Sequence, residues 1–270
     1  MSLSAITPKH LLVPVDYSSA ARSGFDYAEA FRQYFPAQLT ALFVQDPGDA
    51  KHPLEEEQRQ LQRFVRHYPE KEAENYGYEV VRTAVQKGPV IPAILQYLES
   101  TPADLLILGM RSKHEWWEYL LGSTSSHLLH RAPIPVLLVP EGTTFQPLRK
   151  LVLLSDLDME DEPAIAQLLA LGAVFDAQVE QLFINPLPSD FNREQEIVYS
   201  TDWTGNALEN CTKVTMVRNR SIQKGVDYFI EQHQPQLLAV RQPAAQRWIG
   251  FQQRLRHLAY SISIPLLILR

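Results

Sequence analysis

Short apolar runs alternate with longer amphipathic segments along the whole chain, which is the pattern of β-strands alternating with α-helices. The first helix is predicted to begin at Ser18 or Ser19, because serine is a favoured N-cap. Strands that alternate with helices over short connections form a parallel sheet with helices on both faces. In the first half of the chain, the apolar runs predict strands at about 10–16, 38–45, 78–86, 103–109 and 134–140.

The second half of the chain repeats the first in register. QLTALFVQ at 38–45 corresponds to QVEQLFIN at 178–185, 140 residues further on. HLLHRAPIPVLLVP at 127–140 corresponds to HLAYSISIPLLILR at 257–270, at a spacing of 130 residues. The second copy has therefore lost eight residues between its second and third strands, and two more after its fourth strand. Self-similarity on this scale predicts two copies of one fold.

This repeat defines the expected domain organisation. We expect an α/β protein of two tandem five-stranded parallel-sheet domains, residues 1–140 and 149–270, each with helices on both faces. The segment EGTTFQPL at 141–148 is expected to be the linker between them. Two copies of one fold in the same chain are expected to pack as an internal pseudo-dimer.

Candidate chemistry lies between the fourth strand and the helix that follows it. Gly109 and Gly122 enclose a basic, aromatic stretch, and Ser123 and Thr124 suit the start of a helix. Ligands bind at the carboxyl ends of strands in open α/β sheets, where helix N-termini favour anions. Glycines let the backbone approach a phosphate closely, and Arg111 adds positive charge. The simpler alternative is that Gly109 relieves a tight turn and Ser123 caps a helix, with no ligand.

The spacing of Gly109, Ser112, Gly122 and Ser123, G-x2-S-x9-G-S, resembles the phosphate-binding loop G-x2-G-x9-G-[ST] of the universal stress protein family. LLVPVDYS resembles the first strand of that family, with Asp16 at its end, and APIPVLLVP resembles the last. The resemblance extends over both halves of the chain. It implies the tandem form of the family, with an adenine nucleotide alpha-hydrolase-like fold, and it leaves a homodimer open.

The resemblance also implies a nucleotide site in the first half. In the ATP-binding branch of the family, the glycine loop wraps the phosphates and the first-strand aspartate lies near the nucleotide and its Mg²⁺. The residue that corresponds to Val44 contacts adenine. We carry this site over residue by residue and add Arg111, a basic residue of the loop. The expected site of ATP or a related adenine nucleotide then comprises Asp16, Val44, Gly109, Arg111, Ser112, Gly122, Ser123 and Thr124. Asp16 is the expected metal-binding residue.

The sequence departs from the family pattern at several positions. Ser112 replaces the middle glycine, and Trp116 and Trp117 place two large rings in the spacer of the loop. In the second copy, Arg241 stands opposite Gly109 and a pair of glutamines stands opposite Gly122 and Ser123. The second half is therefore expected to be a degenerate partner without a nucleotide.

Composition excludes several other classes of protein. A net charge of −6 argues against a nucleic-acid partner, because no basic face is large enough to neutralise several phosphates. No apolar run approaches the roughly 20 residues that span a bilayer, and the N-terminus has no signal-peptide pattern. One cysteine, Cys211, excludes an internal disulfide. We expect a cytoplasmic protein that binds no membrane.

No catalytic residues can be assigned. The chain has no Walker GxxxxGK[ST], Rossmann GxGxxG or GxSxG sequence, and no nucleophile and base can be paired. Regulatory binding of an adenine nucleotide in a stress response is therefore preferred over catalysis. Two alternatives remain open at this point: a ligand-free interaction module of the same fold, whose partner is another protein, and a slow ATPase.

Overall fold

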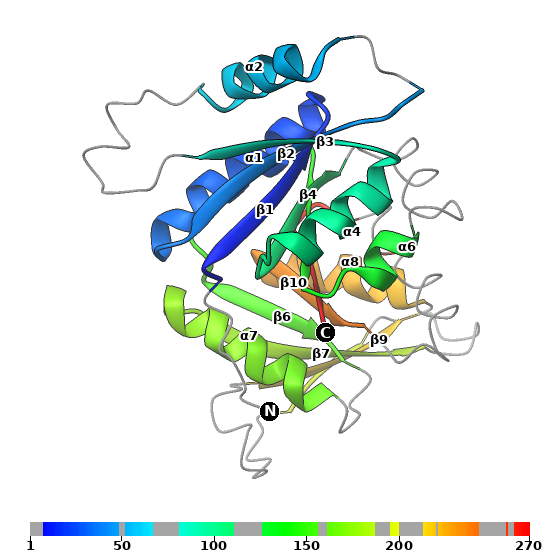
Figure 1. The fold of residues 1–270 in the computed structure, drawn as a ribbon. Helices are drawn as coiled ribbons and strands as arrows, with labels where there is room; N and C mark the ends of the chain where they lie inside the picture. Colours follow the sequence, from blue (N-terminus) through cyan, green and yellow to red (C-terminus); the bar gives the residue numbers. More distant parts are fainter. Residues whose placement is uncertain are drawn as a thin grey trace. The chain divides into compact units, whose positions relative to one another are not determined.

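The chain divides into two compact units, which we call the first unit, Pro8–Phe145, and the second unit, Gln146–Arg270. The division falls inside the predicted linker. A computed structural model describes residues 8–48, 52–66, 81–110, 126–155, 161–186, 195–199, 213–219, 221–242, 258 and 262–270 (Figure 1). Over these residues, no helix has the length and apolar character needed to cross a membrane.

The first unit contains a parallel sheet with the strand order β3-β2-β1-β4-β5. Its strands are β1 His10–Val15, β2 Gln38–Gln45, β3 Arg82–Lys87, β4 Leu105–Met110 and β5 Val136–Pro140. Its helices are α1 Ser19–Phe31, α2 Leu54–Val65, α4 Val90–Ser100 and α6 Ser126–Arg131, and the 3₁₀ turn η1 Arg32–Tyr34 follows α1. The five predicted strands are all present, and the described part of the third begins at Arg82.

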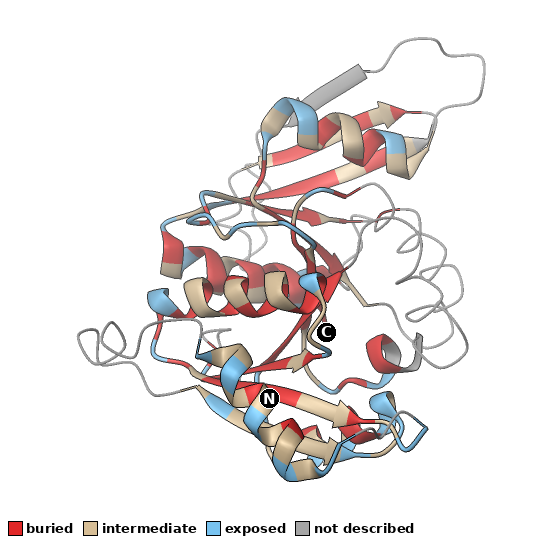
Figure 2. Ribbon diagram, turned by 90° about the horizontal axis from the view of Figure 1, so that it is seen from above, coloured by how far each residue is buried: buried red, intermediate tan, exposed pale blue. Residues whose placement is uncertain are grey.

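Helix α1 forms where the serines and the apolar spacing predict it. The Ser18 hydroxyl caps the helix by accepting a hydrogen bond of 3.1 Å from the backbone N–H of Ala21. One face of α1, including Phe25, Ala28 and Phe31, is buried against the sheet. In Figure 2 the central strands of the unit and the inner face of α1 are buried. Parallel strands require this cover on both faces of the sheet.

The helices of the first unit lie on opposite faces of its sheet. Odd-numbered strand residues face α1 and α2, because Gly109 lies against Ala20 and the Gln58 amide donates to Thr83 Oγ1 at 2.7 Å. Helix α4 packs on β2 and β3 from the other face, which carries the even-numbered residues (Figure 1). Right-handed crossovers require helices on opposite faces, because the chain moves in one direction from β1 to β3 and then returns in the other direction to β4.

The second unit contains the sheet order β11-β10-β6-β7-β9-β8. Five of its strands are parallel, as predicted: β6 Lys150–Leu154, β7 Gln178–Pro186, β9 Lys213–Asn219, β10 Leu237–Arg241 and β11 Leu266–Leu269. Helix α7 spans Glu162–Phe175 and α8 spans Ile222–His233.

One strand of the second unit was not predicted. Strand β8, Gln195–Tyr199, pairs antiparallel with β9 in the region where a helix was expected by analogy with α2. The eight-residue deletion lies in this region. Antiparallel pairing satisfies the outer backbone groups of β9, which an uncovered edge strand would leave open. The deletion thus coincides with an added edge strand.

Candidate functional site

The first unit has a topological switch point between β1 and β4. The chain leaves β1 toward β2 on one side, while β4 lies on the other, and ligands bind in such crevices at the carboxyl ends of the strands. Pairing of β1 with β2 continues to Val15, whereas pairing with β4 includes only Leu11 and Leu12. The sheet is therefore open between β1 and β4 over the last residues of both strands.

Pro14 explains why this pairing stops. The carbonyl of His10 accepts a hydrogen bond from the N–H of Asp104, just before β4, so even-numbered residues of β1 direct their backbone groups toward β4. Pro14 is even-numbered, and proline has no N–H to donate. The opening at the switch point is thus encoded by one residue in the middle of a strand.

The register places three residues in one row across this edge of the sheet. Asp16 follows the last β1 pair, Val15 with Phe43, and the same register puts Val44 beside it on β2. Val44 is in turn paired with Gln86 on β3. By alternation, all three lie on the face that α4 covers. The structure therefore brings together Asp16 and Val44, which the sequence predicted, and adds Gln86, which it missed.

Asp16 has a structural partner and a free oxygen. Its Oδ1 accepts a hydrogen bond of 3.0 Å from the backbone N–H of Ser18, which fixes the turn into α1. Its side chain is exposed, and Oδ2 bonds to no residue within the described ranges. The carboxylate can therefore hold the turn and still offer one oxygen to a cation or a ribose hydroxyl.

Gly109 is required by packing between α1 and β4. A Cβ atom at Gly109 would overlap the carbonyl oxygen of Ala20, and one at Gly24 would lie 2.7 Å from the backbone nitrogen of Gly109. The two glycines let helix and strand backbones touch. This requirement does not depend on a ligand. The other predicted loop residues lie outside the described residues: Arg111, Ser112, Gly122, Ser123 and Thr124.

Tyr17, which sequence reasoning missed, turns away from the row into an aromatic cluster. Its backbone has a positive φ of 63°, an uncommon conformation for a bulky residue. The ring stacks on Phe43 with centroids 4.9 Å apart and meets Phe64 edge-on at 5.8 Å. Burial and the neighbouring Glu57 raise the pKa of Tyr17, so its hydroxyl stays protonated and donates to the Glu57 carbonyl at 3.4 Å.

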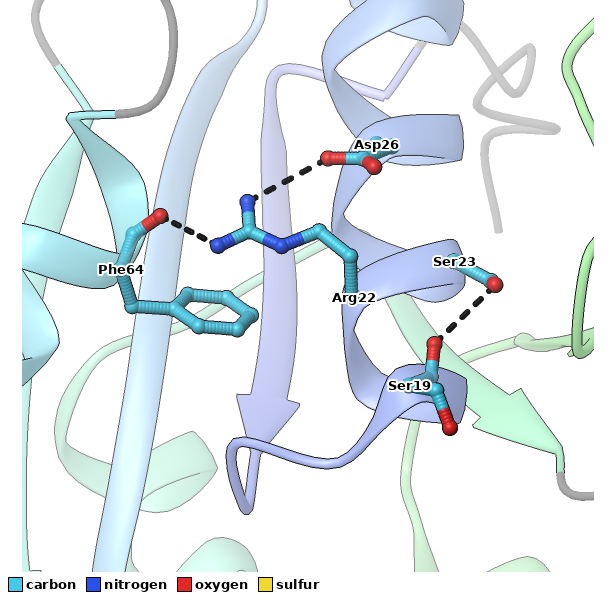
Figure 3. Close-up of polar contacts among 5 residues, drawn as sticks. All are labelled: Ser19, Arg22, Ser23, Asp26 and Phe64. Carbon is cyan, nitrogen blue, oxygen red and sulfur yellow. Dashed lines mark hydrogen bonds and ion pairs between the residues drawn. The ribbon is translucent and has the colours of Figure 1, made fainter.

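Arg22 holds the carboxyl end of α2 against α1 (Figure 3). Its Nη2 donates to the carbonyl of Phe64 at 2.6 Å, and its guanidinium carbon lies 3.7 Å from the centre of the Phe64 ring. Nη1 lies 3.4 Å from Asp26. Carbonyls in the last turn of a helix lack intrahelical partners and favour a cation. Arg22 therefore supplies a hydrogen bond, a charge and a cation–π contact at one point.

We predict that Arg22→Met loosens α2 without unfolding the first unit. Methionine keeps the aliphatic packing but removes the charge and both donors, which should destabilise the closed position of α2 by about 1 kcal/mol. Amide exchange in Leu54–Val65 should become roughly fivefold faster. Arg59→Met is the control, because the Arg59 side chain is 65% exposed and pairs only with the surface carboxylate of Glu56 in the described structure. Equal exchange in both variants would contradict the role of Arg22.

The equivalent edge of the second unit is closed. Pairing of β6 with β10 continues to Leu154 and Val240, at the end of β6. Arg241, which the repeat places opposite Gly109, donates through Nε to Oδ1 of Asp161 at 2.5 Å. Ser155 donates to Oδ2 of the same carboxylate at 2.6 Å. Arg241 and Asp161 thus form a largely buried ion pair between the end of β10 and the start of α7.

The first unit is therefore an open α/β domain with a topological switch point between β1 and β4, and comparison with known proteins identifies its class. Residues 7–140 match the model of the universal stress protein family. A universal stress protein of Methanocaldococcus jannaschii is 26% identical over 144 residues, which cover 48% of this chain and 81% of that protein. The chain belongs to the universal stress protein family.

Other relatives and solved structures extend this comparison. A universal stress protein of Mycobacterium bovis is 26% identical over 141 residues, and the match covers 50% of this chain but only 44% of that protein. A crystal structure of a universal stress protein from Archaeoglobus fulgidus has a TM-score of 0.63 at 13% identity and covers 97% of this chain and 96% of its own. A putative universal stress protein from Pseudomonas aeruginosa has a TM-score of 0.58, also at 13% identity, and the match covers 97% of this chain and 93% of that chain. At these identities, the structures establish a shared fold that includes both units.

Proposed function

We propose that the first unit binds ATP, or a related adenine nucleotide, as a regulatory ligand at the carboxyl ends of β2, β1 and β4. The observation that carries this proposal is the row of Asp16 and Val44 beside the open ladder between β1 and β4. A carboxylate and an apolar side chain lie next to each other there, at the edge where the glycine-containing segment begins. This arrangement suits the ribose and base of a nucleotide whose phosphates extend toward that segment.

Each residue has a distinct role in this proposal. Val44 is half-buried and offers apolar contact to the base, while Asp16 offers an oxygen to the ribose or to Mg²⁺. The segment that follows β4, with Arg111, Ser112, Gly122, Ser123 and Thr124, would hold the phosphates through backbone N–H groups, hydroxyls and one positive charge. Gly109 lets the end of β4 pack directly against the backbone of α1.

The residues present fit a magnesium ion that arrives with the nucleotide. Mg²⁺ is commonly held by one or two carboxylates together with phosphate oxygens and water. Asp16 supplies one such carboxylate. The described ranges contain no group of three His, Cys, Asp or Glu side chains that could hold a metal ion by themselves. We therefore propose that Mg²⁺ binds as the Mg²⁺–ATP complex.

The second unit serves as a degenerate partner in this proposal, with the linker 141–148 between the two domains. Its Arg241, which the repeat places opposite Gly109, is held in a largely buried ion pair with Asp161. Binding should accordingly reach at most one nucleotide per chain. Regulation is preferred over hydrolysis, because no base that could activate a water is assigned at the site. A ligand-free interaction module is the alternative, favoured by the packing role of Gly109.

Calorimetry with Mg²⁺–ATP tests the proposal through Asp16. Asp16→Asn keeps an oxygen that can accept from the Ser18 N–H but removes the charge, so affinity should fall about tenfold while the fold is retained. Asp26→Asn is the matched control, because Asp26 is a carboxylate of α1 with a 42% exposed side chain, outside the row of Asp16 and Val44, and its change should leave affinity unchanged. Gly122→Val should abolish binding by filling the phosphate space. An absence of binding in the unaltered chain would leave the interaction module as the better account.

A further inference from the structure

The row at the carboxyl edge continues past Val44 to a glutamine without a partner. Gln86 is paired with Val44 and shares its face of the sheet. Neighbouring strands lie about 4.8 Å apart, so a purine over Val44 would extend its far edge toward β3. The strand order β3-β2-β1-β4 therefore gives a nucleotide successive positions for base edge, base, ribose and phosphates. This step rests on the proposed function.

The amide of Gln86 is available for recognition. Its side chain is partly exposed and bonds to no residue that the structure describes. Two nearby glutamines, unlike Gln86, have hydrogen-bond partners. The Gln45 amide donates to the His52 carbonyl at 2.7 Å, and the Gln58 amide donates to Thr83. Both of these hold α2 or the segment before it. Of the three glutamines, Gln86 is the one whose amide N–H and carbonyl groups make no hydrogen bond within the described residues.

An exposed apolar side chain marks the same corner of the unit. Val90, the first residue of α4, is 43% exposed, and it is one of two large hydrophobic residues classed as exposed within the described ranges. Helix α4 begins three residues after β3 ends, on the face that carries Gln86 and Val44. Val44 on β2 and Val90 at the start of the helix that packs on β2 and β3 are thus two apolar candidates to flank a planar heterocycle whose polar edge meets the amide of Gln86.

We infer that Gln86 is the base-recognising residue of the nucleotide site. Its carbonyl oxygen accepts a hydrogen bond from the 6-amino group of adenine, and its NH₂ donates to the adjacent ring nitrogen. Glutamine carries both groups in one plane, and this bidentate pairing with adenine recurs in other contexts. Val44 and Val90 supply apolar contact to the ring. Gln86 therefore determines preference among bases, while Asp16 and the phosphate segment bind any nucleoside triphosphate.

A comparison of two triphosphates tests this assignment. Purine riboside triphosphate lacks the 6-amino group of ATP and is otherwise the same molecule. The unaltered chain should bind Mg²⁺–ATP about tenfold more tightly, which corresponds to about 1.4 kcal/mol. In Gln86→Leu this ratio should fall to about one, mainly through a loss of ATP affinity. Gln96→Leu, an exposed glutamine on α4, is the control and should keep the tenfold ratio.

A second variant separates the amide from the apolar contact. Val90→Ser should weaken both triphosphates by about the same factor, roughly threefold, and leave their ratio unchanged. If Gln86→Leu weakens both ligands equally, or leaves the ratio at ten, the inference is wrong while nucleotide binding stands. If the unaltered chain binds neither triphosphate, the proposed function and this inference are both wrong. Circular dichroism of each variant verifies that the fold is intact.

Discussion

Gly109→Ala should destabilise the first unit by about 3 kcal/mol in the absence of any nucleotide. The added Cβ would overlap the Ala20 carbonyl oxygen, which belongs to the backbone of α1 and cannot rotate away. Relief requires a shift of the whole helix from β4, and this shift would open the contact of Gly24 with Gly109 as well. Urea unfolding followed by circular dichroism should show a lower midpoint at an unchanged slope.

Gly48→Ala is the matched control for this prediction. Among the residues that the structure describes, a Cβ at Gly48 would meet only the Asp46 carboxylate oxygen, at 3.4 Å, and the φ of Gly48 is not in the left-handed region. Its unfolding midpoint should stay close to that of the unaltered chain. An unchanged midpoint in Gly109→Ala would mean that α1 does not pack on β4 as the structure shows. A loss of nucleotide binding in Gly109→Ala alone therefore reports on packing and says little about phosphate contact.

Arg241→Met should destabilise the second unit by about 3–5 kcal/mol. The variant leaves the Asp161 carboxylate buried with only the Ser155 hydroxyl among the partners described here, and an uncompensated buried charge is costly. Asp161→Asn combined with Arg241→Met should recover most of this stability, because it removes the charge that the single variant leaves behind. Denaturant unfolding of the unaltered chain, the two single variants and the double variant gives the coupling free energy of the pair.

Arg59→Met is the comparison for an exposed ion pair. Arg59 lies 3.5 Å from Glu56, and both side chains are in contact with solvent, so the pair should contribute less than about 1 kcal/mol. A similar small loss in Arg241→Met would mean that the pair with Asp161 is hydrated. The pair would then no longer support the proposal that the second unit is a degenerate partner.

Together, Gly109→Ala and Arg241→Met separate effects on stability from effects on ligand binding in the two units. The first unit uses glycines to bring α1 onto β4, and the second has at the corresponding position an arginine that pairs with Asp161. The change from glycine to arginine along the repeat thus accompanies a change from a short β1–β4 ladder to a β6–β10 ladder that continues to the end of β6. Nucleotide titrations should be interpreted only for variants whose unfolding midpoint is known.

The sequence by itself determined the elements, their order and the family. Period-two and period-3.6 apolar patterns report which side chains are buried, so the strands and helices of the first unit follow directly from them. Asp16 and Val44 were predicted through the resemblance to the family, and they lie just after β1 and next to last in β2. The repeat predicted five parallel strands in the second unit, and all five are present.

Only the tertiary structure decided what lies beside each of these residues. The role of Gly109 depends on Ala20, which is 89 positions earlier, and that of Arg241 depends on Asp161, which is 80 positions earlier. The place of Gln86 beside Val44 depends on strand register, and that of β8 depends on the open edge of β9. The local pattern of apolar and polar residues does not indicate which residues far apart in the sequence lie next to each other. Such pairs are set by how helices and strands pack once the chain has closed on itself, where small differences in shape and backbone hydrogen bonding select one arrangement.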